Sequence, residues 1–138
     1  MSLRKARLEL IAEMQTISEI RFAPDGIPEQ AHFPFLVSYA DNGVYTMHVT
    51  DGQIKGLHNI TLDLHVIKEP DITRAYDEME PFADLIVEHL YRKLKTREWS
   101  TINTFGQIDY DIAPAQYGGV KTLSIRFVVR DVKVLTNV

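Results

Sequence analysis

The sequence predicts an α+β domain in which a mainly antiparallel β-sheet is covered on one face by two amphipathic helices. Two segments alternate strictly between apolar and polar residues, Gly56–Lys68 and Val120–Arg130. This period of two is typical of strands that bury one face and leave the other polar. A long segment with helical periodicity lies between them, and it can cover the apolar face of the sheet. The 138 residues fit one domain, 1–138.

The N-terminal segment has apolar residues at steps of three and four, namely Leu3, Ala6, Leu10, Met14 and Ile17. This spacing predicts an amphipathic helix over about residues 2–17 that packs on the rest of the domain. Residues Ser18–Phe22 are compatible with a short strand. Proline and glycine residues then predict a loop over Ala23–Pro28.

Two turn signals follow the next strand. Phe33–Tyr39 is strand-like, and Pro34 lies near its start, where a missing N–H group does least harm. Asn42-Gly43 and Asp51-Gly52 are both strong hairpin-turn sequences. We therefore expect a β-hairpin over about residues 40–56 that projects from the sheet.

The strand between these turns is mixed on both faces. One face carries Tyr45, Met47 and Val49, and the other carries Val44, Thr46 and His48. An arm that meets a partner has this pattern, and an ordinary edge hairpin has it equally often. The candidates for an oligomer or partner interface are Tyr45, Met47 and His48.

A long helix is predicted over about residues 72–94, after the break at Glu69-Pro70-Asp71. Pro81 lies inside it, so we expect a bend there or a helix that restarts near Glu80. Basic residues complement the helix dipole in the last turn, namely Arg92, Lys93, Lys95 and Arg97. This interaction with the helix dipole accounts for the cluster of basic residues, so a DNA-binding role is not needed to explain it.

The C-terminal part predicts a strand pair over about residues 104–134. Phe105–Ile112 alternates, Ala113–Gly119 turns the chain, and the last strand runs back as an antiparallel neighbour. The residues after Arg130 are either an ordered tail or a segment that needs a partner. A connector over 96–103 contains the only tryptophan, Trp99.

Composition argues against several classes of protein. The net charge is −4 and the basic residues form no stripe, which disfavours sequence-specific nucleic-acid binding. The absence of cysteine excludes disulfides, thiolate nucleophiles and cysteine metal sites, and it fits a reducing cytoplasm. No apolar segment approaches the roughly 20 residues of a membrane span. A signal peptide is not expected either, because Glu9 and Glu13 interrupt the N-terminal apolar positions.

The sequence contains histidines and aspartates that could take part in catalysis or metal binding, but they do not form a catalytic or metal-binding motif. The five histidines lack metal-ligand spacing, and His58 and His65 are expected on opposite strand faces. Asp63 and His65 share the face predicted to meet solvent, but no nucleophile is tied to them by a motif. The carboxylates of Asp109 and Asp111 could perform acid–base chemistry or bind cations, although alternating acids are common on the wet face of a strand. We therefore predict no catalytic residues, no cofactor and no metal.

The order of these features resembles the tail terminator (tail completion) proteins of long-tailed bacteriophages, which act at the head–tail junction. The resemblance covers about residues 3–134 and consists of element order: the helix, Phe33-Pro34, the two turn signals, the Ile60–Val66 strand, the Glu69-Pro70-Asp71 break, the long helix and a strand pair joined by Gln116-Tyr117-Gly118-Gly119.

The resemblance implies a structural virion protein without an active site. It would form a homohexameric ring that caps the tail tube, stops its elongation and joins it to the head-completion or connector protein. DNA would pass through the ring, and Asp109 and Asp111 would lie at an interface or line the lumen, where negative charge repels DNA. The protein would be made in the bacterial host cytoplasm and end in the tail or neck of the virion.

Other classes stay open at this point. A small α+β enzyme or ligand-binding module could use Asp63 and His65, or Asp109 and Asp111. An adjoining neck protein, or an adaptor dimer of a bacterial secretion or contractile system, would have a similar sequence pattern.

Overall fold

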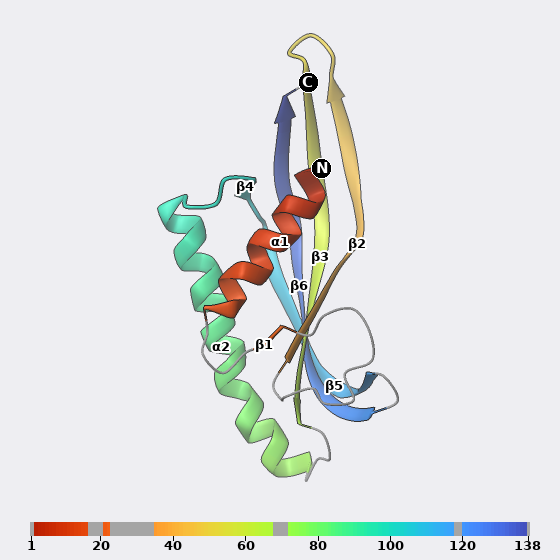
Figure 1. The fold of residues 1–138 in the computed structure, drawn as a ribbon, viewed down its shortest axis with the longest axis vertical. Helices are drawn as coiled ribbons and strands as arrows, with labels where there is room; N and C mark the ends of the chain where they lie inside the picture. Colours follow the sequence, from red (N-terminus) through yellow and green to blue (C-terminus); the bar gives the residue numbers. More distant parts are fainter. Residues whose placement is uncertain (1, 17–20, 23–34, 68–71, 118–119, 138) are drawn as a thin grey trace.

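The computed structural model describes residues 2–16, 21–22, 35–67, 72–117 and 120–137. Within these residues the chain forms α1 (Ser2–Gln15), β1 (Arg21–Phe22), β2 (Phe35–His48), β3 (Gln53–Ile67), α2 (Ile72–Thr96), β4 (Ile102–Thr104), β5 (Gln107–Tyr117) and β6 (Val120–Asn137). Both helices lie on the same side of one sheet (Figure 1). The predicted α+β class is therefore confirmed.

The sheet is centred on the two segments that alternate most strictly in the sequence. Its strand order is β1-β2-β3-β6-β4, and β5 also pairs with β6. The β1–β2 pair is parallel, and the other strand pairs of the described chain are antiparallel. The long strand β6 pairs with β5 along 120–130 and with β4 at Lys133 and Val134. The predicted antiparallel C-terminal pair is thus correct, but the predicted turn over Ala113–Gly119 is wrong for residues 113–117, which continue strand β5 and pair with β6.

The core lies between this sheet and the helices. On β3 and β6 the apolar members of the alternating pattern are fully buried, namely Ile60, Leu62, Leu64, Ile125, Phe127 and Val129. The helices bury apolar side chains against them, namely Ala6, Leu10 and Met14 from α1 and Ile86 and Leu90 from α2. Burial of this apolar surface is the main stabilising term of the fold.

The predicted turn at Asn42-Gly43 is wrong, because both residues lie inside the continuous strand β2. They pair with Asn59 and His58 of β3, next to a shift in register between Ala40 and Asn42. Gly43 does not form a turn; its lack of a side chain allows β2 to lie close to β3 at this point. A Cβ atom at this position would lie 2.6 Å from both the Nδ1 atom of His58 and the backbone oxygen of Leu57.

The second predicted turn, at Asp51-Gly52, is confirmed. The amides of Asp51 and Gly52 donate to the carbonyls of His48 and Val49 at 3.2 Å, and Gly52 has a φ of 62°. The projecting part contains a third strand in addition to the hairpin, because β6 continues beside β3 up to Asn137. Residues 131–137 are therefore an ordered part of the sheet.

Helix α2 runs without interruption from Ile72 to Thr96 and contains Pro81, so a restart near Glu80 is wrong. It ends in a Schellman motif: the amide of Arg97 donates to the carbonyl of Leu94 at 3.3 Å, and that of Glu98 to Lys93 at 3.4 Å. Arg97 has a φ of 55°, at a position that usually holds glycine. Several predicted features lie outside the described residues, namely Phe33-Pro34, the 23–28 loop, the Glu69-Pro70-Asp71 break and Gly118-Gly119.

Candidate interaction surface

The apolar face of the sheet continues beyond the N-terminal end of α1, where β2, β3 and β6 project past the helices (Figure 1). Cross-strand register places Tyr45, Gly56 and Val134 in one row, and Met47, Ile54 and Thr136 in the next. These residues, with Leu3 of α1, line an open cleft of about 360 Å³. Tyr45 is 52% exposed and Met47 is 61% exposed. We call this surface the hairpin cleft.

His58 contributes to the floor of the hairpin cleft. Its ring packs edge-on against the Tyr45 ring, with centroids 5.0 Å apart and planes inclined by 69°. Gly43 and Gly56 flank the imidazole and leave room for it. Burial lowers the pKa of His58. The floor of the cleft is therefore uncharged at neutral pH.

The other face and the tip of the same projection also expose apolar side chains. Val44 is 62% exposed, Val49 at the turn is 89% exposed, and Leu135 of β6 is 38% exposed. His48 points to this second face, because it is adjacent to Met47 along β2. The structure thus brings the predicted interface residues Tyr45 and Met47 together and separates His48 from them.

Sequence reasoning missed the remaining members of the hairpin cleft. Ile54, His58, Val134 and Thr136 come from two strands that are far apart in the chain, and only the register aligns them with Tyr45 and Met47. The glycine at Gly56, inside an otherwise regular alternation, was a usable signal. Glycine within a strand often marks a close approach of another group.

The polar face of the sheet, opposite the helices, is organised around Asp63. Arg126 donates two hydrogen bonds to the Asp63 carboxylate, from Nε and Nη2 at 3.1 Å each. The Tyr39 hydroxyl donates to the same carboxylate at 3.4 Å. The predicted solvent exposure of Asp63 and His65 is wrong, since they are only 7% and 4% exposed. Alternation identifies the face, but it does not show how large neighbouring side chains cover it.

Electrostatics on this face favour a structural role for the Asp63 group. Burial, reinforced by the Asp63 carboxylate, raises the pKa of Tyr39. Burial also lowers the pKa of His65, although the Asp63 carboxylate acts in the opposite direction. The bidentate pair with Arg126 occupies both oxygens of Asp63, so that carboxylate is engaged in an ion pair across β3 and β6.

Asp109 and Asp111 share one face of β5, as predicted from their spacing, but they do not form a purely acidic stripe. Asp109 forms an ion pair with Arg130 of β6. Asp111 lies directly opposite Arg126 in the β5–β6 register. Each carboxylate therefore has an arginine on the neighbouring strand, and the face carries both signs of charge. This arrangement is typical of cross-strand stabilisation.

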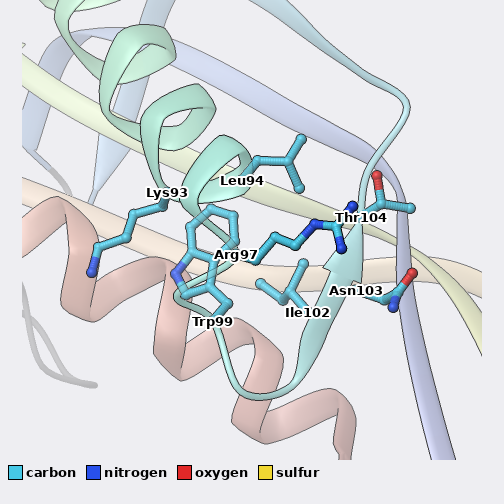
Figure 2. Close-up of a pocket in the computed structure, with 7 residues that line it drawn as sticks. All are labelled: Lys93, Leu94, Arg97, Trp99, Ile102, Asn103 and Thr104. Atoms are coloured by element: carbon cyan, nitrogen blue, oxygen red, sulfur yellow. The ribbon is translucent and has the colours of Figure 1, made fainter.

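A second cavity, of about 420 Å³, lies between the end of α2 and strand β4 (Figure 2). Its lining residues are Lys93, Leu94, Arg97, Trp99, Ile102, Asn103 and Thr104. The Arg97 side chain extends toward Thr104, whereas Lys93 points to the other side of the helix end (Figure 2). We call it the Arg97 pocket. The sequence signals for this pocket are the lone tryptophan and the basic residues at the end of α2, whose favourable interaction with the helix dipole does not by itself indicate a pocket.

The described residues contain no group of three or more His, Cys, Asp or Glu side chains that could hold a metal ion. Among the same residues, no helix is long and apolar enough to cross a membrane.

Comparison of the sequence with models of known protein families finds no match, and comparison with curated proteins finds none either.

Proposed function

We propose that this protein is a structural, ring-forming component of a phage tail, of the tail terminator type. In this role copies of the chain associate head to tail, cap the tail tube and present a surface to the head connector. The proposal combines the element order of the sequence with one structural observation. That observation is the three-stranded projection, which exposes apolar side chains on both of its faces.

On the helix side of the projection, the exposed apolar residues are contiguous and are not scattered singly. Tyr45 and Met47 lie side by side on the helix side, and Val44 and Leu135 lie on the opposite side. Contiguous exposed apolar surface on a folded domain marks an interaction site. Closed rings use heterologous interfaces, in which one surface of a subunit meets a different surface of the next. The projection supplies one such surface.

The alternative of an enzyme or ligand-binding module has less support. Its candidate residues are engaged with arginines, Asp63 with Arg126 and Asp109 with Arg130. Neither the hairpin cleft nor the Arg97 pocket includes Asp63, His65, Asp109 or Asp111. The geometry therefore gives Asp63 and Asp109 charge partners across the sheet, and it places them outside both of these cavities.

The proposal is tested by the solution mass of the purified chain, alone and mixed with a tail-tube protein. We expect a closed oligomer, with a hexamer as the specific expectation. Met47→Asp should reduce the assembled mass, because it places a charge in the exposed apolar surface of the hairpin cleft. Tyr45→Asp should act in the same way, although it also removes the packing against His58.

A matched control is Tyr91→Asp, which changes a side chain of 62% exposure on α2, outside the hairpin cleft. This variant should assemble like the unmodified chain. A monomer at high concentration, both alone and with the tube protein, would rule the proposal out. So would a Met47→Asp variant that assembles normally while Tyr91→Asp does not.

A further inference from the structure

Arg97 combines a strained backbone with an unpaired charge. Its φ of 55° lies in the left-handed region of backbone conformation, which residues other than glycine adopt only at an energetic cost. Among the described residues, no hydrogen bond or ion pair engages its guanidinium group. Lys93, one turn earlier, contrasts with it, because Glu13 and Glu98 hold the Lys93 amine at 3.6 and 3.4 Å. Arg97 is thus the cation of the Arg97 pocket that is available to a ligand.

The wall that faces Arg97 is held in place by the rest of the domain. The Glu9 carboxylate of α1 accepts hydrogen bonds from the amides of Ser100 and Thr101 at 3.2 and 3.1 Å. The Trp99 ring packs against Phe105 with centroids 5.8 Å apart. These contacts fix the segment between α2 and β4 before any ligand arrives, so little ordering is needed on binding.

The chemistry of the pocket selects a negatively charged, extended ligand. The guanidinium fork of Arg97 matches a carboxylate, and Asn103 and Thr104 add an amide and a hydroxyl group. Strand β4 is the last strand of the sheet order, so its outer edge has no strand partner among the described residues. An extended peptide can pair with such an edge through its backbone. Exposed Arg92 and Lys95 make this end of α2 basic on a chain of net charge −4.

We propose that the Arg97 pocket binds an acidic peptide segment of a partner protein, with a Glu or Asp carboxylate on Arg97 and the peptide backbone beside β4. This inference is independent of the hairpin cleft and of ring formation. It goes beyond the proposed function because it assigns a second, chemically different contact surface to the chain. Trp99, the only tryptophan, lines the pocket and reports on its occupancy.

The experiment is a titration of Trp99 fluorescence with an extended peptide that contains two glutamates, with blocked termini. Its counterpart has glutamines at the same positions. We expect a saturable change with the glutamate peptide, weaker binding at high salt, and at least a tenfold rise in Kd (roughly one charge-assisted hydrogen bond) for Arg97→Gly. This variant relieves the strained φ, so it should fold. Lys95→Gln removes a nearby charge outside the pocket lining, so it should weaken binding far less than Arg97→Gly does.

Four outcomes would overturn the proposal. They are no saturable change with the glutamate peptide, equal binding of the glutamine peptide, unchanged Kd in a folded Arg97→Gly variant, and binding of acetate or inorganic phosphate as tight as that of the peptide. The last result would show a site for small anions instead of a peptide. None of them bears on the solution mass of the chain, so this proposal and the proposed function fail separately.

Discussion

The imidazole of His58 occupies the space that a side chain at Gly56 would need. A Cβ atom built on Gly56 meets the Nε2 atom of His58, and its next two contacts are also atoms of the His58 ring. Gly43 limits the same ring from the neighbouring strand β2. The buried histidine is therefore fitted between two glycines, and Tyr45 closes the remaining side.

Gly56→Ala should lower the free energy of unfolding by about 1–3 kcal/mol, because the buried ring must shift to admit a methyl group. Urea denaturation measures this change. In a His58→Ala background the cost should shrink, since the clashing ring is absent. Gly106→Ala is the matched control: its nearest contact would be the side-chain oxygen of Asp131 at 3.3 Å, so a small effect is expected. Equal losses at Gly56 and Gly106 would contradict this account.

Stability should fall as the pH drops below the ordinary histidine pKa. Burial lowers the pKa of both His58 and His65 in the folded state. Between the folded and unfolded pKa values, the unfolded chain binds more protons, so acid favours unfolding. The stabilising contribution is fully present above about pH 6.5 and is lost as the pH falls through the folded pKa.

Urea denaturation at about pH 7.5 and about pH 5.5 measures this dependence, since carboxylates titrate mostly at lower pH. The loss of stability on acidification should be smaller in His58→Gln, in His65→Gln, and smallest in the double variant. If the double variant keeps the full pH dependence of the unmodified chain, other groups are responsible.

The Asp63–Arg126 pair should contribute more to stability than the Asp109–Arg130 pair. Arg126→Gln removes two hydrogen bonds from a carboxylate that is 7% exposed, and we expect a loss of about 1–3 kcal/mol. Arg130→Gln breaks a pair whose side chains are 42% and 43% exposed, so a loss of at most about 1 kcal/mol is expected. Thermal or urea unfolding of both variants makes the comparison, and the reverse order would refute it.

Arg97→Gly should raise the free energy of unfolding by about 1 kcal/mol, because glycine adopts a positive φ without the steric penalty of a side chain. Thermal unfolding measures the gain. Arg97→Ala removes the same charge but keeps the strained backbone, so it should give no comparable gain. A stabilisation by alanine as large as that by glycine would show that the charge, and not the φ angle, is unfavourable.

Local patterns predicted the parts of this fold that depend on one segment at a time. The period of two over Gly56–Lys68 and Val120–Arg130 identified the central strands, and the spacing of Ala6, Leu10 and Met14 identified α1. The turn at Asp51-Gly52 was also correct, because a tight turn is decided by its own residues. The candidate interface was predicted only in part, since Tyr45 and Met47 share a face of one strand.

Local residue patterns are enough to predict the class of the fold, its apolar face and the turn at the tip of the hairpin, because the spacing of apolar residues and the residues of a tight turn are local properties of the chain. Three features become visible only in the folded chain: the role of Gly43 inside a strand, the burial of Asp63 beside Arg126, and the position of Arg97 in a pocket with Trp99 and β4. The first two depend on the register between strands that are distant in the sequence. The third depends on the contacts by which Glu9 of α1 holds the segment between α2 and β4. Register follows from how the whole apolar face packs against the helices, and no short window of sequence contains that information.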